Sequence, residues 1–283
     1  MKSTVNVCCI GSGVMGGALM KAVVKVTGGD KLIIADANPE KAKAFAAEAG
    51  CAAAASNKDA VKGADVVFIA VKPSFIGAVM EDVAPYLAGK TVVSVAAGVP
   101  LASVRESYAF NAMMSGRDGS ETVTFIRLMP NIPATVGEAM IALCTESGAP
   151  AAAENSAVQT VMTLLSQAGR VEQVPEKLMD AVTAVSGSGP AYAFMFIEAL
   201  ADAAVKFGMP RAQAYVYAAQ TLKGAAAMQL ATGTHPGALK DAVCSPAGTT
   251  IEAVKVLEDR GFRSAVIGAA EAAFEKSIEL GKK

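Results

Sequence analysis

The fold is decided near the N-terminus by residues 5–16, which read VNVCCIGSGVMG. The apolar run before Gly11 predicts a buried strand, and the residues after Gly16 predict a helix. The three glycines between them form GxGxxG, which in a strand-to-helix turn indicates a site for the pyrophosphate of a dinucleotide. Gly11 permits the tight turn, Gly13 lets the pyrophosphate approach the backbone, and Gly16 lets the helix pack on the strand. The alternative is an ordinary turn, but the context favours a cofactor site made of Gly11, Ser12, Gly13, Val14, Met15 and Gly16.

Asp36 stands at the end of the second predicted strand, where an acidic side chain accepts hydrogen bonds from the adenine ribose hydroxyls. A carboxylate at this position also repels a 2′-phosphate, so Asp36 favours NADH over NADPH. Asn38 and Lys41 are close in the sequence and offer partial compensation for the charge. The alternative is a solvated aspartate that merely ends the strand.

Downstream, short apolar runs alternate with helical ones, which is typical of a mostly parallel sheet with helices on both faces. We expect strands at 5–10, 31–35, 66–71, 91–96, 125–129, 139–144 and 170–174. Residues 107–122, rich in serine, glycine and asparagine, predict a surface loop. From residue 176 the strand signal stops, and alanine-rich helical runs follow at 178–185, 191–207, 211–231, 236–243, 250–259 and 262–280. We therefore expect an α/β protein with a doubly wound Rossmann-type domain over 1–175 and an all-helical domain over 176–283.

The composition excludes several classes of partner. The chain has 283 residues, 53% hydrophobic and 18% charged, which allows a sizeable core. A formal net charge of −1 without a long basic run does not indicate a basic surface for binding nucleic acid or an anionic membrane. No signal-peptide pattern is present, and no apolar run reaches the roughly 20 residues of a membrane span. Five cysteines without a CxxC pair and a single histidine predict neither disulfides nor a metal site, so we expect a cytoplasmic protein that binds small molecules.

Two turns of small residues precede predicted helices in the second domain. SPAGTT, residues 245–250, would place free N–H groups from about Gly248 to Ile251 at the positive end of a helix dipole. SGSGP, residues 186–190, is a second junction of the same kind. Such turns bind a carboxylate or a phosphate. The alternative is a plain helix start in which the threonine hydroxyls only cap the first amides.

These turns, with GMPR at 208–211 and HPGALKD at 235–241 between them, form an ordered run that resembles the second domain of Δ1-pyrroline-5-carboxylate reductase. The resemblance extends from Val5 to about Lys276. It implies an oxidoreductase that reduces the cyclic imine 1-pyrroline-5-carboxylate to L-proline by hydride transfer from NADPH or NADH, in the last step of proline biosynthesis. NADP is the usual cofactor of that family, and Asp36 argues for NADH instead.

The resemblance also implies which residues bind the two ligands. The further cofactor residues lie at or just after the ends of three predicted strands, at the ligand-binding edge of the sheet, and are Val71, Lys72, Pro73, Ala97, Gly98 and Asn131. The substrate-binding residues that it implies are Ser186, Gly187, Ser188, Ser245, Gly248, Thr249 and Thr250. Of these, Ser245 and Thr250 are the candidate catalytic residues, with Thr250 in reach of the ring nitrogen.

No conventional general acid is evident in the sequence. A protonated iminium accepts hydride far better than a neutral imine, so the enzyme needs only to bind the cation, with catalysis resting on positioning and preorganised electrostatics. His235 precedes Pro236 at a helix start and is expected to be structural. Ala247 replaces a glycine that is usual in the family's turn, which requires a negative φ at this residue.

The helical run at 212–231 is apolar or alanine-rich on too many faces for a surface helix, so we expect a homodimer or higher homo-oligomer through the helical domain. The alternative is a tightly packed monomeric bundle.

Two other functions compete with the reductase. A β-hydroxyacid dehydrogenase carries GSGxxxKxxxN, but Ala193 and Ile197 replace that lysine and asparagine here. A non-catalytic dinucleotide-binding sensor keeps the fold without chemistry, and the paired threonines at 249 and 250 argue against it.

Overall fold

The computed structural model describes residues 4–116, 122–145 and 151–281. The chain divides into two compact units. The first comprises Met1–Gly187 and Phe274–Lys283, and the second comprises Ser188–Ala273. The first unit thus extends past residue 175. The domain boundary expected there stays a prediction.

One eight-stranded sheet organises the first unit, with the strand order β3-β2-β1-β4-β5-β6-β7-β8. The strands are β1 (Val7–Ile10), β2 (Leu32–Ala35), β3 (Ala52–Ala53), β4 (Val66–Ile69), β5 (Thr91–Ser94), β6 (Thr124–Met129), β7 (Ala139–Thr145) and β8 (Gly169–Gln173). Neighbouring strands pair in parallel except β6 and β7, which are antiparallel. The expected doubly wound, mostly parallel sheet is therefore confirmed.

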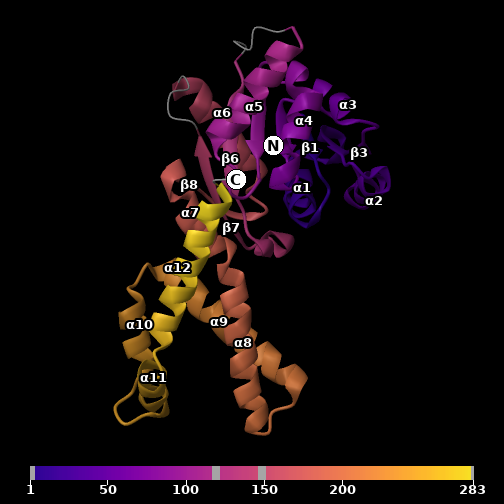
Figure 1. Ribbon diagram of the computed structural model, residues 1–283. Coiled ribbons are helices and arrows are strands. Elements are labelled where there is room, and N and C mark those ends of the chain that lie inside the picture. The colour runs from indigo at the N-terminus through magenta and orange to yellow at the C-terminus, as the bar shows by residue number, and fades with distance from the viewer. Residues whose placement is uncertain (1–3, 117–121, 146–150, 282–283) are drawn as a thin grey trace. The chain divides into compact units, whose positions relative to one another are not determined.

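Helices cover both faces of this sheet (Figure 1). They are α1 (Val14–Thr27), α2 (Pro39–Ala49), α3 (Asn57–Lys62), α4 (Ile76–Val83), α5 (Leu101–Met114), α6 (Ala151–Leu164) and the single turn α7 (Met179–Val182). α1, α2 and α6 pack on one face, and α3, α4 and α5 pack on the other. Side chains alternate along β1, so Cys9 lies in the first core and Cys8 in the second. Burial raises the pKa of Cys8 to about 12, so this thiol stays protonated and acts as a small core hydrophobe.

The surface loop expected over residues 107–122 is wrong for its first part, because α5 continues to Met114. Four side chains at helical spacing are buried along α5: Leu101, Val104, Tyr108 and Ala112. The side-chain amide of Asn111 donates to the carbonyl of Ser107 at 2.8 Å, one turn back in the helix. A narrow apolar stripe thus outweighs the weak helix propensity of serine and asparagine. Residues 117–121 lie outside the described residues.

The second unit is entirely helical. It contains α8 (Gly189–Lys206), α9 (Arg211–Thr232), α10 (Pro236–Val243), α11 (Thr249–Asp259) and the first part of α12 (Phe262–Gly281). Within it, the hydrophobic side chains that are fully buried are only Ala201, Ala214 and Ala218, where α8 packs on α9. Large apolar side chains remain exposed, among them Phe194, Met195, Phe207, Val216 and Leu230. Across the described residues, no helix is both long and apolar enough to span a membrane.

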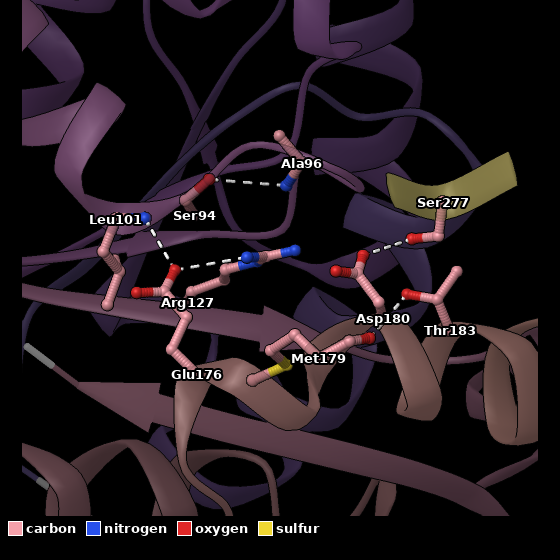
Figure 2. Close-up of polar contacts among 9 residues, drawn as sticks. All are labelled: Ser94, Ala96, Leu101, Arg127, Glu176, Met179, Asp180, Thr183 and Ser277. Atoms are coloured by element: carbon pink, nitrogen blue, oxygen red, sulfur yellow. Dashed lines mark hydrogen bonds and ion pairs between the residues drawn. The ribbon is translucent and has the colours of Figure 1, made fainter. Parts of the chain in front are cut away.

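The segment that follows β8 holds the start of α5 in place. Figure 2 shows that Glu176 reaches both α5 and β6. Its Oε1 accepts the backbone N–H of Leu101 at 2.8 Å and lies 3.2 Å from Nη1 of Arg127. The side chain of Arg127 is only 6% exposed. Glu176 therefore neutralises a buried cation and caps α5 at the same time.

One turn further along, Asp180 holds the end of α12. The buried Ser277 donates its hydroxyl to Oδ1 of Asp180 at 2.6 Å (Figure 2). The next turn of α12 lies against the turn between β5 and α5, where a Cβ on Gly281 would be 3.1 Å from the carbonyl oxygen of Gly98. Residues 176–180 thus secure both the start of α5 and the helix end that covers the β5–α5 turn.

We expect Glu176→Ala to lower the free energy of unfolding by about 2 to 3 kcal/mol, because it leaves the buried Arg127 without its carboxylate and an N-terminal amide of α5 without its acceptor. Glu172→Ala is the matched control, since Glu172 pairs with Arg170 in solvent and such pairs contribute about 0 to 1 kcal/mol. Urea denaturation of the three proteins compares them. Equal midpoints for the two variants would contradict a structural role for Glu176.

Candidate functional site

The glycine turn after β1 brings three backbone segments into contact. Gly11 has a φ of +105°, and a Cβ on it would overlap the carbonyl oxygen of Ala70, which follows β4. A Cβ on Gly16 would overlap the carbonyl oxygen of Gly11 and would lie 2.9 Å from Cβ of Ala70. Cys9 supports the turn from beneath, with its Sγ 3.4 Å from the same carbonyl of Gly11. Glycine is therefore a steric requirement at positions 11 and 16.

Gly13 differs from these two glycines, because the space beside it is open. A Cβ on Gly13 would meet no protein atom within 4 Å, and its φ of −64° is accessible to any residue. It is the N-cap of α1, whose first amides have no acceptor within the helix and whose first turn has no acidic residue. Open space, free N–H groups and the positive end of a helix dipole fit the pyrophosphate of a dinucleotide.

Asp36, directly after β2, is bound to the glycine turn. Its Oδ2 accepts both the backbone N–H and the hydroxyl of Ser12, each at 2.7 Å, and its Oδ1 accepts the backbone N–H of Asn38 at 2.9 Å. Partial burial raises the pKa of Asp36, but these hydrogen bonds outweigh it and hold the pKa below the usual value. The carboxylate is therefore ionised at neutral pH and fixed between two loops. The bond from the Ser12 hydroxyl was not expected from the glycine pattern.

The other predicted cofactor residues follow β4, β5 and β6, which lie side by side and parallel to β1. Parallel strands end at one edge of the sheet, so the topology brings these residues to the edge that carries the glycine turn. Lys72 and Pro73 are exposed, and Ala97 is exposed beside the half-buried Gly98. Val71 lies against Gly11, since its Cγ1 would be 3.3 Å from a Cβ built there.

Asn131 is buried and is used by the protein itself. Its Nδ2 donates to the carbonyl and the hydroxyl of Ser186 at 3.1 and 3.3 Å, and its Oδ1 accepts the N–H of Met140 at 3.0 Å. Ser186 and Gly187 belong to a π-helical turn over Thr183–Gly187, and a Cβ on Gly187 would be 2.7 Å from Cε of Met129. Single π turns occur often at functional sites. Asn131 and Ser186, expected to meet different ligands, therefore form one hydrogen-bonded cluster in the first unit.

Ser188 begins the second unit as the N-cap of α8. The turn before α11 lies further along the same unit, with Gly248 as the N-cap. The N–H of Gly248 is not free as expected, because it donates to the carbonyl of Ser245 at 3.0 Å. The first amides without an acceptor in the helix are those of Thr249, Thr250 and Ile251. No side-chain hydrogen bond caps α11, so the structure does not have the plain capped start considered as an alternative.

The negative φ expected at Ala247 is wrong. Its φ is +54°, and among the described residues it is the single non-glycine with a positive φ. The left-handed region costs an L-residue about 1 to 2 kcal/mol, so this turn is held in place by its surroundings. A Cβ on the next residue, Gly248, would overlap Oγ of Ser245, so the hydroxyl of Ser245 lies directly against the start of α11.

His235 has the structural role expected of it. It is the N-cap of α10, and its Nδ1 accepts the N–H of Gly237 at 3.0 Å. That nitrogen is consequently occupied by a backbone amide. Among the described residues, no cluster of histidine, cysteine, aspartate and glutamate has the arrangement of a metal site.

Comparison with known proteins gives the same family along nearly the whole chain. A family model described as pyrroline-5-carboxylate reductase dimerisation matches residues 176–280, and one described as NADP oxidoreductase coenzyme F420-dependent matches residues 6–98. The pyrroline-5-carboxylate reductase of Escherichia coli K12 is 43% identical over 277 residues, which is 96% of this chain and 97% of the relative. That of Methanosarcina acetivorans is 41% identical and covers 97% of both chains.

Two solved structures have the same architecture. The pyrroline carboxylate reductase of Plasmodium falciparum, determined with NADP bound, has a TM-score of 0.83 at 30% identity and covers 99% of this chain and 100% of its own. The pyrroline-5-carboxylate reductase of Coxiella burnetii has a TM-score of 0.86 at 29% identity with the same coverage. Because two relatives more than 40% identical align with nearly the whole chain, the chain belongs to the pyrroline-5-carboxylate reductase family.

Proposed function

We propose how the two units share the family's reaction. The chain is an NAD(P)H-dependent oxidoreductase that reduces 1-pyrroline-5-carboxylate to L-proline. In our proposal the first unit holds the cofactor at the glycine turn, and the turn at residues 245–250 of the second unit holds the substrate. The observation that carries this proposal is the pair of open helix N-termini, one in each unit, since both ligands are anions.

On the cofactor side, the amides at the start of α1 bind the pyrophosphate where Gly13 leaves room, and Asp36 accepts a hydrogen bond from the adenine ribose. Val71, Lys72, Pro73, Ala97 and Gly98 line the same sheet edge, and Asn131 orders the Ser186 segment beside them. The bound dinucleotide supplies a hydride. Because Asp36 carries a full negative charge, we propose that NADH is used at least as well as NADPH.

On the substrate side, the free amides of Thr249, Thr250 and Ile251 and the Ser245 hydroxyl bind the carboxylate. Thr250 also hydrogen-bonds the ring nitrogen. Ser186, Gly187 and Ser188 are further proposed substrate-binding residues. The chain binds the iminium already protonated, so no side chain has to donate a proton before hydride transfer. Catalysis then rests on orientation and fixed dipoles.

The protein forms a homo-oligomer, consistent with the dimerisation model that matches residues 176–280. We propose that the second unit forms the interface of a homodimer or a higher assembly, because its own core is three alanines and its large apolar side chains are exposed.

We also propose domain limits of 1–175 and 176–283. We further propose a cytoplasmic location, which suits five free thiols. Steady-state oxidation of NADH and NADPH with the cyclic imine tests the activity, and no turnover with either would leave a non-catalytic sensor.

We expect Gly13→Ala to weaken NADH and NADPH binding at least tenfold without changing the melting temperature, because the added Cβ fills ligand space and touches no protein atom. Gly16→Ala is the contrasting control, since its Cβ overlaps the backbone and must destabilise the fold. Fluorescence titration and thermal unfolding give the two readouts. Unchanged cofactor affinity in a folded Gly13→Ala protein would move the pyrophosphate elsewhere.

We expect Thr250→Val to lower kcat and Ser245→Ala to raise KM for the imine, each by about tenfold to a hundredfold, the range for one hydrogen bond to a charged group. Thr163→Val on α6 removes an exposed hydroxyl that bonds only its own helix, and it should have wild-type kinetics. Steady-state kinetics of the three variants provide the comparison. Wild-type constants in both site variants would exclude the turn at residues 245–250 as the substrate site.

We expect Val216→Glu to dissociate the oligomer toward the monomer mass of 28.6 kDa, because it places a charge on an exposed apolar face of α9. Val216→Ala is the control, since it shortens the same side chain without adding charge. Sedimentation equilibrium at micromolar concentration measures the mass. A Val216→Glu protein with the wild-type mass would place the interface on another surface.

A further inference from the structure

The carboxylate of Asp36 has few acceptor sites left for a ligand. A carboxylate oxygen accepts about two hydrogen bonds. Oδ2 already accepts two, from the N–H and the hydroxyl of Ser12, and Oδ1 accepts one, from the N–H of Asn38. One acceptor position on Oδ1 therefore remains for the adenine ribose.

Of the three donors, only the Ser12 hydroxyl depends on the identity of a side chain. The amides of Ser12 and Asn38 would be present with any residue except proline at those positions. The hydroxyl oxygen of Ser12 lies 2.7 Å from Oδ2 of Asp36, as close as the amide nitrogen of the same residue. Ser12 therefore donates two hydrogen bonds to this one oxygen. Two donors on one oxygen and a third on the other resist rotation of the carboxylate about its Cβ–Cγ bond.

We propose that Ser12 is a specificity-determining residue, whose hydroxyl locks the Asp36 carboxylate against the glycine turn and thereby maintains discrimination between NADH and NADPH. The inference rests on the proposed function, in which this turn binds the dinucleotide and Asp36 meets the ribose. While the Ser12 hydroxyl is bonded to Asp36, the carboxylate cannot rotate away from the 2′-phosphate of NADPH. The electrostatic repulsion between the two anions then weakens NADPH binding to its full extent. Without the hydroxyl, the side chain is free to rotate toward solvent, and the 2′-phosphate is tolerated better.

The local charge supports this interpretation. Lys41, on the first turn of α2, is the cation whose attraction contributes to the low pKa of Asp36, and its effect is smaller than that of the hydrogen bonds from Asn38 and Ser12. The preference between NADH and NADPH at this site therefore depends on the direction in which the Asp36 carboxylate points. Ser12 is adjacent in space but distant in sequence, so it acts through Asp36 and is a positioning residue for the ribose contact.

The test measures dissociation constants of NADH and NADPH by isothermal titration calorimetry, without substrate, for wild type, Ser12→Ala, Ser12→Thr, Asp36→Ser and the double variant Ser12→Ala/Asp36→Ser. The readout is the ratio of the NADPH constant to the NADH constant, which does not change with the fraction of folded protein. We expect Ser12→Ala to lower this ratio by about threefold to tenfold, since one of three bonds to the carboxylate is lost. Ser12→Thr keeps the hydroxyl and should restore the wild-type ratio.

The double variant shows whether Ser12 acts through Asp36. If it does, adding Ser12→Ala to Asp36→Ser changes the ratio no further, so the two substitutions are strongly coupled. A ratio that Asp36→Ser shifts but Ser12→Ala does not would overturn this inference and leave the proposed cofactor site intact. A ratio unchanged in Asp36→Ser would overturn the ribose contact as well, and unchanged affinities in Gly13→Ala would overturn the cofactor site itself.

Discussion

The structure depends on the contact among Gly11, Gly16 and the backbone at Ala70, where no side-chain atom can be added. The absence of two Cβ atoms lets the start of α1 touch the ends of β1 and β4. This contact fixes the direction of α1, and with it the direction of the free amides at its N-terminus. Because β2, β4, β5 and β6 run parallel to β1, every loop at that edge is placed relative to this one contact. The proposed cofactor site is thus a consequence of backbone packing before any side chain contributes.

A different constraint shapes the helical unit. Alanines at 201, 214 and 218 let α8 and α9 pack closely, but small side chains bury little apolar area. The larger apolar side chains of these helices, such as Phe194 and Val216, remain in solvent in the isolated chain. Hydrophobic stabilisation scales with buried area, so most of what these residues can contribute requires a second protein surface. If the second unit forms the proposed interface, assembly contributes much of its stability.

Local patterns in the sequence predicted the features that depend on local rules. The glycine spacing and the alternation of strands and helices determined the sheet, and the helices of the second unit matched their apolar and alanine-rich runs closely. α5 was missed because its signal is a narrow stripe ending in Tyr108 and Ala112, set among serine and asparagine that usually favour loops. The bonds of Glu176 to Arg127 and Leu101 join residues 49 and 75 positions apart, and no sequence period encodes such a distance. The bond between Ser12 and Asp36 had one visible signal, a hydroxyl placed between the first two glycines.

Ala247 shows how the proposed substrate turn, residues 245–250, combines backbone strain with the placement of polar groups. Its left-handed backbone is unfavourable by about 1 to 2 kcal/mol for an alanine, and glycine would remove most of that cost. The conformation is maintained because Gly248 donates to the carbonyl of Ser245 and closes the turn. The same closure brings the Ser245 hydroxyl against the first turn of α11, in a space that a Cβ on Gly248 would occupy. Strain of this kind persists only where the surrounding structure over-determines the backbone. Here it keeps a hydroxyl and three unbonded amides together at one helix N-terminus, which is the arrangement that a carboxylate requires.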